Sequence, residues 1–211
     1  MSGASGVATA LPRRGRRARR WYHGRMFDES LLAPEGIRPL RRAEYEELVD
    51  LGFFEDEKIE LLRGFLVTMS PQKAPHANAP AVLMERLILA LGKRAPERAH
   101  SPLALGDWSE PEPDVVVVPR GDYSQAHPTE ALLVVEASDS SLRKDRRIKA
   151  EIYAEHGIPE YWIVNLVERV LAVHSAPAGG RYTRVSTHGP EERVRPLAFP
   201  EVEIAVADLV G

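Results

Sequence analysis

Two carboxylates, Asp114 and Glu136, bound the most apolar stretches of the sequence and are the first candidates for chemistry. Asp114 directly precedes the run VVVV, and Glu136 closes the run LLVV. A carboxylate at the end of a buried strand is costly unless a cation or several hydrogen-bond donors satisfy it. If the two strands are neighbours, the acids meet at one end of the sheet and repel each other. A divalent metal removes this conflict, and oxygen ligands favour Mg²⁺, with Mn²⁺ as the alternative.

A lysine follows these acids on the next predicted helix. Lys149 lies 13 residues after Glu136 (149 − 136), beside Ile148 and Ile152, which are expected to face the sheet. Near a metal-bound water, its ammonium would orient the nucleophile and stabilise negative charge on a phosphate. Spacing alone leaves structural alternatives open. Lys149 could instead pair with Asp145 one helical turn earlier, and the two acids could pair with arginines or backbone donors.

The elements that must position these groups follow from the spacing of apolar residues. DVVVV and ALLVV are continuously apolar, which is typical of strands buried on both faces of a sheet. Residues 131–166 form a strand–helix–strand unit, a crossover that makes its two strands parallel. We therefore predict a mixed α/β (α+β) domain with helices packed on a central mixed sheet. The expected elements are helices at 40–51, 80–94 and 142–156, hairpins at 58–69 and at 169–175 with 181–187, strands at 102–108, 114–118, 131–137 and 160–166, a loop at 70–80, and a short strand with one helical turn at the C-terminus.

Composition limits the class of protein. The 211 residues are 44% hydrophobic and 28% charged, which suits one globular domain with a tail. The lack of cysteine in the sequence excludes disulfides, thiolate nucleophiles and iron–sulfur clusters, and it fits the reducing cytoplasm, where we expect the protein. No apolar run approaches the ~18 residues that would suggest a membrane span, so no membrane partner is expected.

The net charge of −3 conceals an uneven distribution along the chain. Residues 1–25 hold seven of the 28 basic side chains and none of the 31 acidic ones, so the remainder carries 21 against 31, a net charge of −10. We expect residues 1–35 to be a basic, disordered extension, either a polyanion-binding arm or an unstructured addition. Residues 36–211 are expected to form the domain, whose acidic body restricts any polyanion contact to a local, metal-assisted one.

Longer segments of the body resemble one known family. The segments EPEPDVVVVP, LLVVEASDSSLRKDRRIKAEIYAEHGIPEYWIVNL and RVLAVHS, with KIELLRGFLVTMSPQKAPHANA before them and LAFPEVEIAVADLV after them, resemble the Uma family of putative restriction endonucleases, within the PD-(D/E)XK nuclease superfamily. The resemblance covers about residues 36–210. It implies a restriction-endonuclease-like core in the order helix, three strands, helix, strand, with added hairpins.

The resemblance also implies a site and a reaction. It implies that Asp114 and Glu136 hold Mg²⁺ beside the backbone carbonyl of Ala137, and that the substrate is DNA, whose phosphodiester bonds an endonuclease hydrolyses. The usual motif has a lysine two residues after the acid, where this sequence has Ser138. In this family the lysine has moved to the following helix, which indicates Lys149.

Two further residues have open roles. Glu60, in KIELL, matches an upstream acidic position of the family and either completes the site or is the outward residue of an amphipathic strand. Tyr153 either faces the site beside the lysine or packs beneath it, and we expect packing.

Two functions remain in view at the level of sequence. One is a metal-dependent DNA endonuclease. The other is a catalytically silent interaction or oligomerisation module, because a fold alone does not establish activity. A homodimer is the default assembly, since symmetric dimers are the commonest oligomers.

Overall fold

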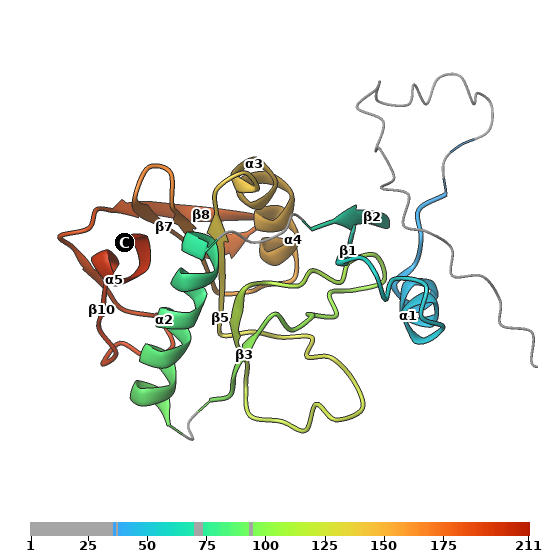
Figure 1. The fold of residues 1–211 in the computed structure, drawn as a ribbon, viewed down its shortest axis with the longest axis horizontal. Helices are drawn as coiled ribbons and strands as arrows, with labels where there is room; N and C mark the ends of the chain where they lie inside the picture. Colours follow the sequence, from blue (N-terminus) through green and yellow to red (C-terminus); the bar gives the residue numbers. More distant parts are fainter. Residues whose placement is uncertain (1–35, 37, 70–73, 93–94) are drawn as a thin grey trace, which may run out of the picture. The chain divides into compact units, whose positions relative to one another are not determined.

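A mixed six-stranded sheet is the centre of the fold in the computed structural model (Figure 1). The strand order is β3-β4-β5-β6-β7-β8, in which β5 and β6 run parallel and the other neighbours are antiparallel. This confirms the parallel pair predicted from the crossover. The six strands are β3 (Glu97–Ala99), β4 (Val115–Val117), β5 (Leu133–Ser138), β6 (Glu160–Asn165), β7 (Val170–Ala178) and β8 (Arg181–His188).

The structure describes residues 36, 38–69, 74–92 and 95–211, without the side chains of 74–77. The chain divides into Met1–Ile37 and a compact unit, Arg38–Gly211, and all that follows concerns this unit. The basic extension expected over residues 1–35 lies outside the described residues.

Helices cover both faces of the sheet, which explains why β4, β5 and β6 are buried throughout (Figure 1). On one face lie α2 (Ala74–Leu91) and α5 (Val206–Val210). On the other lies one continuous helical segment made of α3 (Leu142–Lys144), η2 (Asp145–Lys149) and α4 (Ala150–Glu155). Successive residues of a strand point to opposite faces. Val135 therefore packs with the core on the α2 side, and Val134 packs with the core on the α4 side.

A hairpin outside the sheet is important for the site. It consists of β1 (Ile59–Leu62) and β2 (Phe65–Thr68), which follow α1 (Arg42–Asp50). Arg63 and Gly64 at its turn both have positive φ, 52° and 83°, as a two-residue type I′ turn requires. Two backbone hydrogen bonds between Leu61 and Glu110 attach the hairpin to the segment that leads into β4.

The C-terminal segment adds a second small strand pair, β9 (Arg193–Val194) with β10 (Ile204–Ala205). The strand β10 and the short helix α5 confirm the strand and helical turn expected there. No helix among the described residues is both long and apolar enough to cross a lipid bilayer.

Two sequence-based expectations about elements are wrong. No strand forms at 102–108, where the amides of Leu103 and Leu105 bond to the carbonyls of Pro111 and Ser109 in a compact turn. The partner of β4 is instead β3, nearer the N-terminus. The expected loop at 70–80 is helical from Ala74 onwards, although Pro80 lies inside this helix and cannot donate an intrahelical hydrogen bond. Residues 70–73 lie outside the described part of the chain.

Candidate active site

The pairing of β4 with β5 brings Asp114 and Glu136 to the same end of the sheet. Val115 pairs with Val135, so extending this register by one residue places Asp114 opposite Glu136. The Oδ2 atom of Asp114 accepts a hydrogen bond of 2.8 Å from the backbone amide of Ala137. Both carboxylates are buried. The structure thus brings together the three residues that the resemblance places at a metal site.

Lys149 lies at the centre of this cluster and is only 1% exposed. Its Nζ atom is 2.7 Å from Oε1 of Glu136 and 2.8 Å from Oε2 of Glu60. Glu60 is fully buried, and its Oε1 atom lies 2.6 Å from Nζ of Lys144. Of the two interpretations of Glu60, the structure therefore favours the one in which it belongs to the site.

A π-helical turn explains how Lys149 reaches the sheet. The segment η2 spans Asp145–Lys149, and a π turn accommodates one more residue than an α turn. This shifts the phase of the helix, so that Lys149 and Ile152 are buried while Ile148 is 42% exposed. The expectation that Ile148 faces the sheet is wrong for this reason. Single π turns are frequent at functional sites.

Asp145 does not form the expected alternative pair with Lys149. Its Oδ2 atom accepts hydrogen bonds from the hydroxyls of Ser138, at 2.7 Å, and Ser141, at 2.6 Å. Its Oδ1 atom is buried and has no hydrogen-bond partner among the described residues. Ser138, at the position where the usual motif has a lysine, therefore attaches the start of the helix to the end of β5.

Among the described residues, the cluster holds more negative than positive charge. Its charged members are the carboxylates of Glu60, Asp114, Glu136 and Asp145 and the ammonium groups of Lys144 and Lys149. Burial raises the pKa of Glu136 well above its ordinary value, Asp145 and Asp114 raise it further, and Lys149 only partly opposes them. An additional cation near Glu136 would favour the ionised form of its carboxyl group and so oppose this rise in pKa.

The lysines stabilise the ionised form of the third acid. Burial alone would raise the pKa of Glu60, but Lys149 and Lys144 outweigh it and hold that pKa below its ordinary value. Burial likewise acts to lower the pKa of Lys149, whereas Glu136 and Glu60 raise it well above its usual range. Both carboxylates thus favour the protonated form of Lys149.

The donor set fits a hard divalent cation. The described part of the chain contains no group of three acidic or histidine side chains arranged to hold a metal ion. The available donors are the carboxylates of Asp114 and Glu136 and the backbone of Ala137. Mg²⁺ is commonly bound through one or two carboxylates and keeps several waters, so this set suits it. A divalent cation would also offset the surplus negative charge of the cluster.

Two further contacts complete the cluster. Tyr153 is fully buried, as expected, and its hydroxyl also donates a hydrogen bond of 3.1 Å to Oε1 of Glu136, so both alternatives for this residue hold. Its position four residues after Lys149 places the two side chains on one face of the helix. Lys144 reaches Glu60 from the first turn of the same helical segment, and nothing in its spacing predicts a partner in a distant hairpin.

Comparison with known proteins first identifies the class of fold. The crystal structure of a putative nuclease belonging to DUF820, from Anabaena variabilis ATCC 29413, is similar with a TM-score of 0.66 and 14% sequence identity. The match covers 82% of this chain and 98% of that one, so the two share a fold. No curated protein matches the chain. Residues 42–207 match the Uma2 family, described as putative restriction endonuclease, and the chain therefore belongs to that family. This confirms the resemblance found in the sequence.

Proposed function

We propose that this protein is a metal-dependent endonuclease of the PD-(D/E)XK type that hydrolyses phosphodiester bonds of DNA at the cluster around Lys149. One observation carries the proposal. Carboxylates from β1 and β5 converge on one buried lysine, with a third carboxylate beside them at the start of β4, in a chain of the Uma2 family. Asp114, Glu136 and the carbonyl of Ala137 would hold Mg²⁺, and Mn²⁺ could replace it.

Each group of the cluster has a part in this proposal. A bound divalent cation would polarise the scissile phosphate and lower the pKa of the attacking water. Lys149 supplies positive charge for the developing oxyanion of the phosphate. Glu60 holds the ammonium of Lys149 in place, and Tyr153 fixes the orientation of the Glu136 carboxylate. These groups are preorganised by burial, which strengthens their electrostatic effect.

The proposal is tested by nicking of supercoiled plasmid DNA in Mg²⁺, in Mn²⁺ and in EDTA. The parent protein is expected to nick the plasmid with either cation and to be inactive in EDTA. The isosteric variants Glu136→Gln and Asp114→Asn remove one metal ligand each, and we expect each to lower the rate about 100-fold.

A matched control is Glu130→Gln, which makes the same change at an exposed position outside the cluster. Thermal unfolding of all variants verifies that they are folded. If parent, site variants and control nick DNA at equal rates, the cutting does not come from this cluster. Labelled RNA of the same sequence, assayed in parallel, decides whether the substrate is DNA.

The rival function is a catalytically silent module on the same fold. The feature that favours it is that the lysines already pair with Glu60 and Glu136 within the protein, as a purely structural ion-pair network would. Absence of cation-dependent cutting on plasmid, duplex and single-stranded substrates alike would support this rival and contradict the nuclease.

A further inference from the structure

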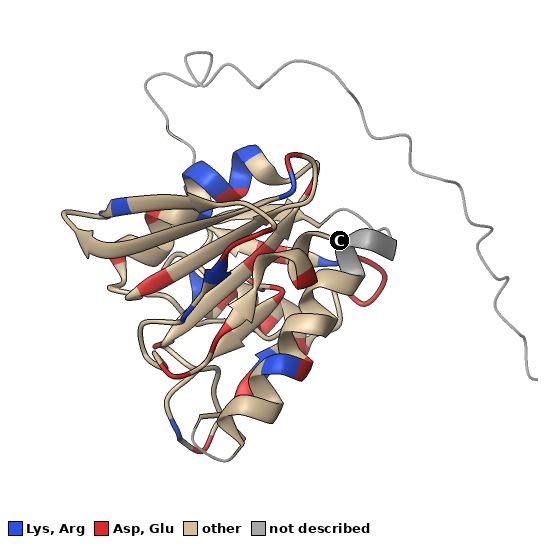
Figure 2. Ribbon diagram, turned by 90° about the vertical axis from the view of Figure 1, so that its left-hand side faces the viewer, with Lys and Arg blue, Asp and Glu red and all other residues tan. Residues whose placement is uncertain are grey.

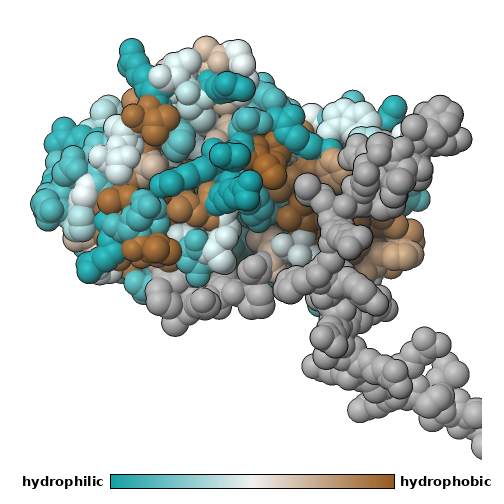
Figure 3. Space-filling model, turned by 90° about the horizontal axis from the view of Figure 1, so that it is seen from above, coloured by the Kyte–Doolittle hydropathy of each residue, from teal (hydrophilic) through white to brown (hydrophobic). Residues whose placement is uncertain are grey.

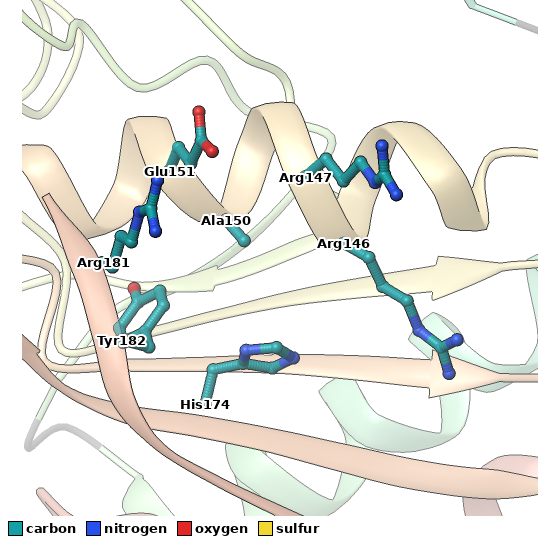
Figure 4. Close-up of a pocket in the computed structure, with 7 residues that line it drawn as sticks. All are labelled: Arg146, Arg147, Ala150, Glu151, His174, Arg181 and Tyr182. Carbon is teal, nitrogen blue, oxygen red and sulfur yellow. The ribbon is translucent and has the colours of Figure 1, made fainter.

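A basic cavity lies beside the acidic cluster, on another side of the same helical segment. Its volume is about 400 Å³, and it is lined by residues of the helical segment and of the β7–β8 strand pair (Figure 4). Arg146, Arg147 and Glu151 come from η2 and α4, whereas His174 comes from β7 and Arg181 comes from β8. Tyr182 completes the wall. None of these side chains belongs to the cluster around Lys149.

The cavity carries net positive charge within an acidic body. Three guanidinium groups line it against one carboxylate, and that carboxylate, of Glu151, also lies 3.4 Å from Arg63. Arg146 approaches Glu168 at 3.6 Å. Within the described ranges, Arg147 and Arg181 form no ion pair. Figure 2 shows blue segments gathered on the helix at the top, and Figure 3 shows hydrophilic side chains across the centre of the face seen from above.

The aromatic wall opposite Arg146 and Arg147 is held in place by hydrogen-bond and ring contacts (Figure 4). The hydroxyl of Tyr182 donates a hydrogen bond of 2.9 Å to the carbonyl of Ile158. The rings of His174 and Tyr182 contact each other, with centroids 5.8 Å apart, and both contact the buried ring of Tyr161. Planar guanidinium groups suit the oxygens of a phosphate, which they bind through paired hydrogen bonds. A rigid aromatic wall beside them suits the sugar or base attached to that phosphate.

The cavity and the cluster are close enough for one nucleic-acid chain to contact both. Glu136 lies on β5, and the strands of the cavity are β7 and β8, with β6 between. Adjacent strands are about 4.8 Å apart, so β5 and β7 are separated by roughly 10 Å. That length corresponds to about three base-pair steps along the axis of a DNA duplex. A single helical segment therefore carries both Lys149 of the cluster and Arg146 and Arg147 of the cavity.

We propose that this cavity binds a backbone phosphate of the nucleic-acid chain, a few nucleotides from the bond that is cut. The inference rests on the proposed function for its substrate. The cavity positions the chain and takes no part in the chemical step. It explains how a protein with an acidic body holds a polyanion locally.

The test is fluorescence anisotropy with a labelled short DNA duplex in EDTA, where cutting does not interfere. The double variant Arg147→Gln/Arg181→Gln is expected to bind about tenfold more weakly at low salt. The slope of log Kd against log salt concentration should fall by about 2, since each phosphate contact contributes about one unit. In Mg²⁺ the double variant should raise KM and leave kcat unchanged.

The matched control is Arg193→Gln/Arg195→Gln, which removes the same charge from two arginines that pair with Glu203. The control should keep the affinity and the salt slope of the parent. Equal losses in both double variants would overturn the proposal, because they would reflect net charge alone. Absence of DNA binding by the parent would overturn it as well.

Two further arms separate the possible failures. Glu136→Gln should still bind the duplex through the cavity although it does not cut. Binding and cutting are thus measured separately, and a failure of the proposed nuclease activity would not by itself contradict phosphate binding in the cavity. Calorimetric titration with a nucleoside monophosphate and with inorganic phosphate identifies the source of the phosphate. If the free nucleotide binds as tightly as the duplex, the cavity is a site for a small molecule, and the proposal that it binds a nucleic-acid chain is overturned.

Discussion

At the residue scale, Glu110 is the buried acid outside the cluster with the most unusual environment. Its Oε2 atom has no hydrogen-bond partner among the described residues. Burial, reinforced by Glu46 and opposed by Arg42, raises its pKa from 4.5 to about 7. Since its pKa in the unfolded chain is the lower one, the folded protein binds a proton more tightly. The stabilisation is complete below pH 4.5 and is lost as the pH rises through 7.

The substitution Glu110→Gln should remove this pH dependence, because the amide does not ionise. We expect the variant to be more stable than the parent at about pH 8, by about 2 kcal/mol, with little difference at about pH 5. Urea unfolding of parent and variant at the two pH values measures this difference in stability. The exposed Glu130→Gln variant should follow the parent at both. The same loss of stability with rising pH in Glu110→Gln as in the parent would show that another group is responsible.

Asp114 and Glu136 could be singled out from the sequence because charged residues at the edges of apolar runs are conspicuous, whereas Lys149 was indicated by the family resemblance. The sequence left Glu60 undecided because its partners depend on how a hairpin docks, which no local pattern encodes. For Tyr153 the sequence offered both a place in the site and simple packing, and it favoured packing for a related reason. A tyrosine on an apolar helix face packs in the core whether or not its hydroxyl finds a partner.

At the scale of elements, the β1–β2 hairpin carries Glu60 and depends on Gly64. A Cβ atom at this position would lie 2.4 Å from Cβ of Pro39 and 3.1 Å from the carbonyl oxygen of Leu40. The φ of +83° is also unfavourable for any residue with a side chain. Position 64 of the turn therefore requires glycine, and the placement of Glu60 depends on this turn.

We expect Gly64→Ala to lower the free energy of unfolding by about 2 kcal/mol, from backbone strain and steric overlap together. Its plasmid nicking should also fall, because Glu60 loses its position beside Lys149. Gly92→Ala is the matched control, since Gly92 has a φ of +56° with open space around its Cβ position. Gly92→Ala should lower the free energy of unfolding only by the smaller cost of backbone strain. Its plasmid nicking should equal that of the parent. Equal effects of the two substitutions on both readouts would rule out the hairpin's role.

The long apolar runs made β4, β5 and β6 predictable, and apolar periodicity revealed the helices. The errors lie where tertiary contacts decide. Leu103 and Leu105 are apolar enough for a strand but pair their amides within a turn, and β9 has two residues, too few for any pattern. The π turn of η2 was unpredictable because it depends on the fit of Lys149 between two carboxylates.

At the scale of the whole compact unit, the sheet separates two cores. Leu83, Leu87 and Leu91 of α2 are buried at intervals of four on one face. The cluster of acids and lysines lies on the other face, beneath η2 and α4. The sheet thus separates the cluster from the core that α2 forms.

The variant Leu87→Ala should therefore separate stability from nicking. It leaves a cavity in the core and should lower the free energy of unfolding by about 2–5 kcal/mol. Nicking by the folded variant at 25 °C should remain that of the parent. Leu89→Ala, at a position that is 76% exposed, should change neither property. A folded Leu87→Ala protein that no longer cuts would show that the faces are coupled.

The placement of Lys149 also bears on how relatives of this chain can be recognised. A search pattern that requires a lysine two positions after the acid would pass over this protein, because Ser138 stands there. The crossover returns over the face from which Glu136 projects, so a cation can enter the same point in space from the helix. A lysine on this helix would therefore serve the proposed site as a lysine at position 138 would serve it from the strand. A search pattern built on the proposed site would instead require an acid that ends an apolar strand and a lysine in the helix that follows.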